Sequence, residues 1–203
     1  NRSSNCRTLH LMKKILVVAS DKAELKGLNG DFLTLVSGVG PILASAKTAG
    51  AIVMTGAEVV VSIGSCGSLG RIKRGEVVSF SNVVTPDQDL SSMHLSLGST
   101  IDWNRSTIKE LRTADRKSGL TLLSSGTFTS SYRDVFSSFS PDCVDMEAYG
   151  VGMAALSQGI PFYAIKLVTD IVGDHSTVGD ISFSMREGRA RLFQVLQELG
   201  DSL

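Results

Sequence analysis

The fold is decided by one stretch, Val144-Asp-Met-Glu-Ala-Tyr-Gly-Val-Gly-Met-Ala-Ala-Leu-Ser-Gln-Gly-Ile-Pro-Phe-Tyr-Ala-Ile-Lys-Leu-Val-Thr-Asp170. In residues 146–158, apolar or small side chains recur at spacings compatible with one buried side of a helix. Gly159 then ends the helix, and Pro161 prevents its continuation. Residues 162–168 are a nearly unbroken apolar run, which is typical of a strand covered on both faces. The stretch therefore predicts a helix followed by a buried strand.

Two carboxylates bracket this unit. Glu147 lies at the start of the helix, and Asp170 lies just past the strand. Ligands of an open α/β sheet gather at the carboxyl ends of its strands, so both acids are well placed for chemistry. Both acids could also have a purely structural role. An acid in the first turn of a helix often complements the helix dipole, and an acid after a strand often forms a turn. These two residues alone leave both interpretations open.

The rest of the chain alternates strands and helices in the same way. Apolar runs predict further strands at residues 15–19, 32–36, 59–63, 75–84 and 120–123. The periodic pattern predicts further helices at residues 41–55, 107–117 and 182–199. The polar segment 85–98 is expected to form the rim or lid of a site. Because there is no repeat or linker, we expect one α/β domain over residues 12–203, preceded by an extension at residues 1–11.

Two other strands are followed by segments of interest. Residues 15–19 lead into a short helix capped by Ser20 or Asp21, which places Glu24 one turn inside it. Residues 59–63 lead into Gly64-Ser-Cys-Gly-Ser-Leu-Gly70, whose glycines allow the backbone to approach a ligand closely. This pattern is neither a P-loop nor the dinucleotide fingerprint. Without a functional role, Glu24 would be a solvated acid in a first helical turn, and residues 64–70 would form an ordinary turn.

The composition excludes several classes of protein. The chain has 203 residues, enough for one domain with a real core, and its 20 basic and 20 acidic residues cancel. Nothing therefore suggests a nucleic-acid partner, and no apolar run approaches the length of about 20 residues that spans a membrane. The three cysteines form no C-x-x-C pair, and the three histidines show no metal-ligand spacing. We expect no metal and no disulfide framework.

The first eleven residues show no periodic pattern and are interpreted as an extension or the end of a processed leader. Cys6 lies near the start of the chain, where a lipid anchor can be attached, but Ser-Ser-Asn before it matches such a site poorly. The absence of disulfide patterning favours a cytoplasmic protein over an exported or lipid-anchored one.

Four motifs together resemble the nucleoside phosphorylase and nucleosidase superfamily, most closely the 5′-methylthioadenosine/S-adenosylhomocysteine nucleosidases. They are the Gly-rich turn, Lys-Arg-Gly-Glu-Val-Val, Val-Asp-Met-Glu-Ala and Val-Thr-Asp, in the order and approximate spacing of that family over residues 14–199. The resemblance implies a single-domain, three-layer α/β sandwich around a central mixed, twisted β-sheet. It also implies a homodimer in which the partner chain helps to close the pocket for the 5′ substituent.

The resemblance assigns roles to particular residues. Glu24 matches the glutamate that positions and activates water, and Ser65 lies near that water. Asp170 matches the aspartate that hydrogen-bonds the purine and protonates N7. Glu147 matches the acid that binds the ribose hydroxyls, and Met146 the methionine packed against the sugar.

Other binding residues follow from the same resemblance. They are Gly67 of the Gly-rich turn, Phe128 and Thr129 of the loop over the base, Lys166 and Thr169 beside Asp170, and Phe183 near the 5′ substituent. Lys166 stands where these nucleosidases usually have arginine, and lysine cannot make the same bidentate contacts. Thr169 replaces the usual serine.

The chemistry of purine release suits three acids in separate environments. The acid that protonates the base must keep a proton near neutral pH, and burial behind strand 162–168 would raise the pKa of Asp170 as required. Glu24, near a helix start, is favoured as an ionised base that can take a proton from water. Glu147 can accept hydrogen bonds from two vicinal hydroxyls and hold the ribose. Such a hydrolysis needs no cofactor.

Water is favoured over phosphate as the nucleophile. The bacterial purine phosphorylases that the chain resembles carry an arginine just before the Gly-rich turn, where this chain has Ser62. Lys22 is the only cation in the loop after the first strand. A doubly charged phosphate would therefore face Glu24 with little compensation.

Three alternatives stay open. The segments 25–32 and 85–103 are shorter than usual in the family, and they shape the rim and the 5′ pocket, so another purine nucleoside such as futalosine is a candidate substrate. A purine nucleoside phosphorylase is the second alternative. A nucleoside-binding module without turnover is the third, although a pure binder has no need of a proton donor at N7.

Overall fold

A computed structural model of the chain describes residues 13–102 and 106–203. The predicted extension at residues 1–11, with Cys6 and His10, lies outside the described residues.

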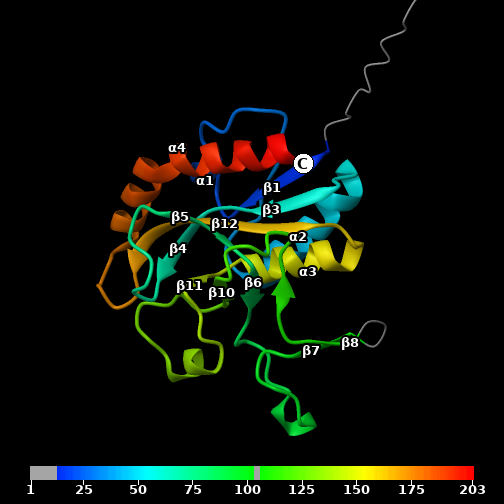
Figure 1. The fold of residues 1–203 in the computed structure, drawn as a ribbon, viewed down its shortest axis with the longest axis vertical. Helices are drawn as coiled ribbons and strands as arrows, with labels where there is room; N and C mark the ends of the chain where they lie inside the picture. Colours follow the sequence, from blue (N-terminus) through cyan, green and yellow to red (C-terminus); the bar gives the residue numbers. More distant parts are fainter. Residues whose placement is uncertain (1–12, 103–105) are drawn as a thin grey trace, which may run out of the picture.

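Within the described residues, ten strands form one mixed, twisted sheet (Figure 1). Along the sheet the order is β2-β1-β3-β12-β4-β11-β10-β6-β9, and β5 also pairs with β12. The ten strands are β1 (Ile15–Ala19), β2 (Leu33–Val36), β3 (Val59–Ser62), β4 (Ser65–Ser68), β5 (Val77–Phe80), β6 (Asn82–Val84), β9 (Leu111–Arg112), β10 (Thr121–Ser124), β11 (Cys143–Asp145) and β12 (Phe162–Ile171). Strands β7 (Thr100–Asp102) and β8 (Ser106–Ile108) form a separate antiparallel pair.

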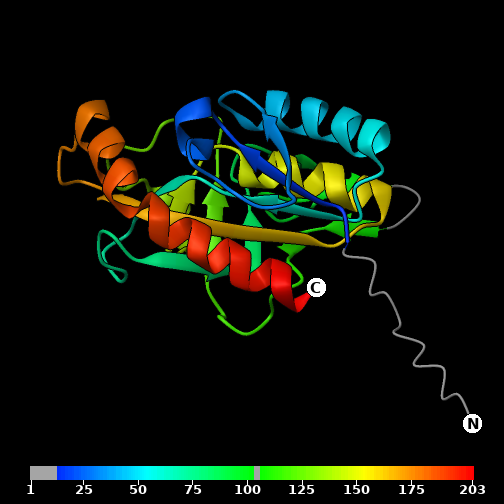
Figure 2. The same ribbon diagram turned by 90° about the horizontal axis from the view of Figure 1, so that it is seen from above.

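Helices cover both faces of the sheet (Figure 2). Helices α2 (Pro41–Thr55) and α3 (Ala148–Gln158) lie on one face, and α4 (Val178–Ser202) lies on the other. The short elements are α1 (Lys22–Leu25) and the 3-10 turns η1 (Ser91–Met93) and η2 (Asp134–Ser138). The alternating side chains of β1 divide between two apolar clusters, one under α2 and α3 and one under α4. The predicted three-layer α/β domain is therefore confirmed.

Strand β12 holds the middle of the sheet. Its first part pairs in parallel with β3, its last part pairs in parallel with β4, and β5 runs antiparallel to its central residues. The register with β4 shifts between Val168 and Asp170, so Thr169 is the extra residue of a bulge. The strand also continues to Ile171, so Asp170 lies inside it. The prediction that Asp170 lies just past the strand is therefore wrong.

Two helices begin at other residues than predicted. Helix α3 begins at Ala148, two residues later than predicted, and Glu147 is its N-cap residue. Helix α4 begins at Val178, four residues earlier than predicted, because Thr177 and Asp180 form a reciprocal capping box. Helix α4 is long but polar on its outer side, and none of the helices in the described residues could cross a membrane.

The predicted helix at residues 107–117 is wrong. Its apolar positions are few, and Ile108 is β-branched, so a helix here would have only a thin buried face. The segment instead adds β9 as an edge strand, with Leu111 buried and Arg112 opposite Asn82. The Thr113 hydroxyl then donates to the carbonyl of Phe80. Long-range pairing has therefore overridden the local pattern.

Candidate active site

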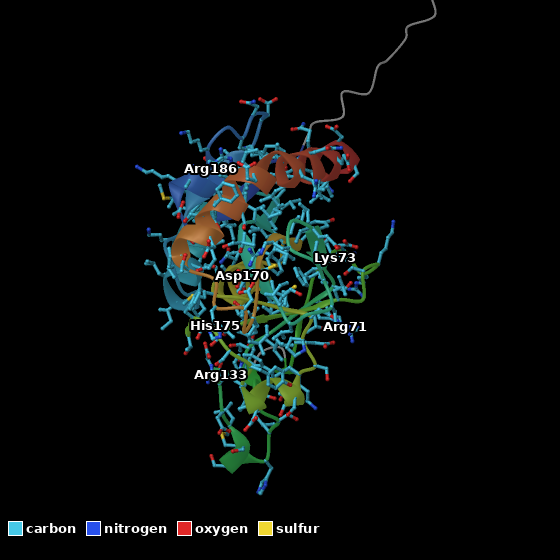
Figure 3. All side chains as sticks on the ribbon, turned by 90° about the vertical axis from the view of Figure 1, so that its left-hand side faces the viewer. Arg71, Lys73, Arg133, Asp170, His175 and Arg186 are labelled. Atoms are coloured by element: carbon cyan, nitrogen blue, oxygen red, sulfur yellow. The ribbon has the colours of Figure 1, made fainter. Side chains whose placement is uncertain are left out.

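Two of the predicted acids, Glu147 and Asp170, line one cavity at the carboxyl ends of the strands, and the third, Glu24, lies beside it, bonded to the lining residues Ser20 and Ser65. Figure 3 looks onto this end of the molecule, with Asp170 near its centre. The cavity has a volume of about 210 Å³. It is lined by Ser20, Val39, Ser65, Cys66, Gly67, Thr127, Phe128, Thr129, Val144, Asp145, Met146, Glu147, Asp170, Val178 and Ile181.

The carboxylate of Glu24 accepts hydrogen bonds from three donors. The N–H and the hydroxyl of Ser20 each donate to Oε2 at 2.8 Å, and the N–H of Ser65 donates to Oε1 at 3.0 Å. Asp21 caps the short helix α1 that carries Glu24. Gly64 is required beside this carboxylate, because its φ is +132° and an added Cβ would lie 2.6 Å from Oε1. The donors and the glycine fix the position of Glu24 between two residues that line the cavity.

Asp170 is oriented by the bulge in β12. The hydroxyl of Thr169 donates its one hydrogen to Oδ1 of Asp170 at 2.8 Å, and the carbonyl of Cys66, at 3.4 Å, is a more distant second acceptor. The other oxygen, Oδ2, lies against Gly67, and a Cβ added to Gly67 would be only 2.9 Å from it. Burial raises the pKa of Asp170, as predicted from the sequence, and the hydrogen bond from Thr169 opposes that rise. The neutral form of Asp170 is therefore more favoured than in an exposed aspartate, and its Oδ2 lies beside Gly67 of the cavity lining.

Glu147 stands where β11 passes into α3. Its Oε1 accepts a hydrogen bond of 3.0 Å from the N–H of Gly40, the residue that caps α2. Burial, followed by the nearby negative charge of Asp145, raises the pKa of Glu147 to about 7. The charge of Lys166 and the bond from Gly40 act in the opposite direction. The side chain is therefore poised to change charge near neutral pH.

Lys166 lies behind the cavity and does not line it. Its side chain is 1% exposed, and its Nζ lies 2.8 Å from Oδ2 of Asp145. Nζ also donates to the hydroxyl of Ser62 at 3.1 Å and to the carbonyl of Ile63 at 3.2 Å. The lysine predicted to bind substrate is thus placed among protein acceptors.

The structure brings most of the predicted site residues to the cavity. Those that line it are Ser65, Gly67, Phe128, Thr129, Met146, Glu147 and Asp170. Glu24 and Thr169 do not line the cavity but are hydrogen-bonded to the lining residues Ser65 and Asp170, respectively. Phe183 lies on α4, outside the lining, with 56% of its surface exposed. Their predicted roles stay predictions, because geometry alone does not test them.

Several lining residues were not assigned from the sequence, among them Ser20, Val39, Asp145 and Ile181. Asp145 carried a usable signal, since it is an acid at the end of a strand and two residues before Glu147. Val39 and Ile181 carried none, because single apolar residues in a loop or a helix have no distinctive pattern.

Two larger hollows lie elsewhere. One, of about 850 Å³, lies beside β9 and the end of α3, and the other, of about 980 Å³, lies along α2. Neither is lined by Glu24, Glu147 or Asp170. Among residues 13–102 and 106–203, no group of three acidic, histidine or cysteine side chains is arranged to hold a metal ion.

Comparison with known proteins agrees with this architecture. Residues 25–199 match the family described as the phosphorylase superfamily. No curated protein matches the sequence.

Solved structures give extensive matches at low identity. A 5′-methylthioadenosine/S-adenosylhomocysteine nucleosidase from Colwellia psychrerythraea, in complex with adenine, has a TM-score of 0.81 and 20% identity over 95% of this chain and 96% of that chain. A mutant Helicobacter pylori nucleosidase of the same kind, with 5′-methylthioadenosine in its active site, has a TM-score of 0.79 and 18% identity over 94% and 99%. The futalosine hydrolase of Helicobacter pylori has a TM-score of 0.80 and 17% identity over 96% and 100%.

The bond from Thr169 yields a test of how Asp170 is tuned. Thr169→Val removes a donor to the charged form, so we expect the pKa of Asp170 to rise further, by about one unit. Thr169→Ser keeps the hydroxyl and should leave the pKa near that of the original protein. Titration of the 13C-labelled aspartate carboxyl carbons by NMR measures both, with Asp170→Asn identifying the signal. A valine variant with an unchanged titration would show that Thr169 does not tune Asp170.

Proposed function

Since the chain belongs to the phosphorylase superfamily, we propose that it is a purine nucleosidase that hydrolyses the N-glycosidic bond of 5′-methylthioadenosine, S-adenosylhomocysteine or both. The observation that carries the proposal is one small cavity lined by Asp170 and Glu147, with Glu24 bonded to two of its lining residues, and with a different environment for each acid. Burial raises the pKa of Asp170, Glu24 is bound by three donors, and Glu147 accepts a hydrogen bond from the N–H of Gly40 at the start of α2. No cofactor is needed for the steps below.

Asp170 is proposed as the general acid. As the bond between C1′ and N9 breaks, its electron pair passes to the purine, and Asp170 donates a proton to N7 from the oxygen beside Gly67. A neutral carboxyl is required for this step, and the burial of Asp170 favours it. Phe128 and Thr129, from the loop after β10, lie on the same cavity and would cover the base.

Glu24 is proposed as the base that activates water. The water oxygen forms a new bond to C1′, and one of its protons passes to Glu24. The hydroxyl and N–H of Ser20 and the N–H of Ser65 hold the carboxylate in place, so it needs no rearrangement to accept that proton. The products are the free base and the ribose with its 5′ group.

Glu147 is proposed to hold the sugar. An ionised glutamate can accept hydrogen bonds from both the 2′ and 3′ hydroxyls, which fixes C1′ relative to water and base. Met146, next to it in the lining, would pack against the ribose.

The lining favours water over phosphate. None of the described residues that line the cavity is a lysine or an arginine. The nearest buried cation, Lys166, already has three acceptors within the protein. A phosphate dianion would therefore enter a site with three acids and no free cation, which is unfavourable.

Futalosine is the second candidate substrate. The chain matches a futalosine hydrolase in fold as well as it matches the nucleosidases. Val178, which lines the mouth of the cavity, and Phe183 nearby on α4 are exposed apolar side chains that an apolar 5′ group could contact. Either substrate would use the same three acids.

A homodimer is also proposed. One side of α2 presents Ile42, Ala46, Gly50 and Val53 to the outside, and Ile42 and Val53 are 86% and 69% exposed. Val39, just before this helix, lines the cavity and is itself exposed, so a second chain on α2 would lie at the edge of the site. An apolar stripe of this kind is typical of an interface.

The activity is tested with a panel of nucleosides in phosphate-free buffer. We expect adenine and 5-methylthioribose to be released from 5′-methylthioadenosine, and added phosphate not to accelerate the reaction. Chromatography of 5′-methylthioadenosine, S-adenosylhomocysteine, adenosine, inosine and futalosine reactions gives the relative rates. A strong dependence on phosphate would instead establish a phosphorylase, and no cleavage in either buffer would favour a binding module.

The role of the general acid is tested by Asp170→Asn. Loss of the donated proton should lower kcat by about 10²–10⁴-fold, while adenine binding is retained. Asp201→Asn, an exposed residue in the last turn of α4, is the matched control and should keep full activity. Titration calorimetry with adenine separates binding from turnover. Full activity in the Asp170 variant would exclude the assigned role.

The interface on α2 is tested by Ile42→Glu. A charge on the exposed stripe should convert the dimer into a monomer in sedimentation analysis at micromolar concentration. Gln194→Glu, on the exposed side of α4, adds a charge to the opposite face and should leave the dimer intact. A monomeric unmodified protein, or a variant that remains dimeric, would contradict this assignment.

A further inference from the structure

A buried ion pair lies behind the cavity, and the proposed mechanism does not use it. Among the described residues, Lys166 is the one lysine or arginine whose side chain is buried, and its partner Asp145 is 1% exposed at the side chain. Burying two charges is costly unless both are well hydrogen-bonded. The pair therefore requires an explanation beyond stability.

Lys166 has no hydrogen left for a substrate. A lysine ammonium has three donors, and here they have three acceptors in Asp145, Ser62 and Ile63. Those acceptors belong to the ends of β11 and β3 and to the residue after β3, while Lys166 itself belongs to β12. The ammonium thus fixes the relative positions of three chain segments beneath the site.

Asp145 connects this ammonium to the cavity. Its Oδ2 accepts from Lys166 and, at 3.0 Å, from the N–H of Ala148, the first residue of α3. Its Oδ1 has no hydrogen-bond partner among the described residues, although it is buried and Asp145 lines the cavity. The two bonds to Oδ2 hold the short segment between β11 and α3, which includes Glu147.

We propose that Lys166 and Asp145 are positioning residues that together set the charge on Glu147 and so its ability to hold the ribose. The inference rests on the proposed function for the role of Glu147, but the charge itself can be measured without it. Lys166 acts as the one buried cation among the described residues and favours the charge of Glu147, and Asp145 acts as the like charge beside it.

The groups that face Glu147 come from four elements. Asp145 at the end of β11 and Glu24 in α1 disfavour its negative charge, whereas Lys166 in β12 and the Gly40 N–H before α2 favour it. Asp170 also faces the cavity, but its own environment is set by Thr169, Asp174 and Arg74.

Cys66 in β4 is the remaining titratable group that lines the cavity. Burial, followed by contact with Cys143, raises the pKa of its thiol well above the usual value, so it is neutral near pH 7. It therefore adds no charge beside Glu147.

The two members of the pair should act in opposite directions. The pKa of Glu147 is about 7, so the carboxylate is present above that pH and lost below it. Lys166→Met removes the favourable charge and should move the midpoint up by about one pH unit or more. Asp145→Asn removes the unfavourable charge and should move the midpoint down by about one unit. If the pair only stabilised the structure, the two variants would not be expected to shift the midpoint of Glu147 in opposite directions.

The experiment is an NMR titration of the 13C-labelled glutamate carboxyl carbons in the ligand-free protein, with Glu147→Gln identifying the signal. The variants are Lys166→Met, Asp145→Asn, the conservative Lys166→Arg, and the double variant Asp145→Asn/Lys166→Met. We expect the arginine variant near the original midpoint and the double variant between the two single ones. The double variant removes both charges of the pair, so neither member is left buried without the other, and it keeps the test available if Lys166→Met does not fold.

The acid limb of kcat/KM is the second readout. It should follow the NMR midpoints if Glu147 must be ionised to hold the ribose. Unchanged midpoints, or shifts of both single variants in the same direction, would overturn the proposal. Midpoints that shift as expected in a protein without nucleosidase turnover would refute the proposed function and leave this inference standing.

Discussion

A buried ammonium has to be neutralised and fully hydrogen-bonded, and this constraint governs the end of the sheet where the candidate site lies. Lys166 meets it through Asp145, Ser62 and Ile63, which bring the ends of β11 and β3 to β12. The same contacts place Asp145 against the first residue of α3 and leave Glu147 at the helix boundary. Lys166 therefore belongs to the charged groups around Glu147 without lining the cavity itself.

Much of the fold follows from the sequence, because strands buried on both faces leave a strong apolar signal. Residues 15–19, 59–63 and 162–168 are strands within a few residues, and residues 41–55 are the predicted helix. Residues 75–84 form two strands rather than one, because Ser81 turns the chain from β12 toward β10. The helix predicted at residues 107–117 is wrong because the contacts that determine this segment, such as that of Thr113 with Phe80, are distant in sequence.

Part of the cavity lining was predictable where short motifs carry it, and less so where geometry does. Glu147 and Asp170 were named from their motifs, from the start of a helix and from the end of a strand, and both line the cavity, while their roles stay predictions. The bulge at Thr169 was not predictable, since a shift of register depends on two strands at once. Lys166 was named from the resemblance as a substrate-binding residue, whereas the local sequence shows it only as an interruption of an apolar run. Its three acceptors come from segments at least 21 residues away, which no local pattern connects.

The position of β12 in the chain has a consequence for synthesis. This strand occupies the centre of the sheet between β3 and β4, yet it spans residues 162–171 of a chain of 203. Until it has left the ribosome, β3 and β4 each lack a neighbour and expose unpaired backbone groups flanked by apolar side chains. Such edges pair readily with other chains. The nascent protein is therefore vulnerable to aggregation after β3 and β4 have emerged and before residues 162–171 follow them, and chaperone binding in that interval would protect the strands that carry Ser62 and Ser65.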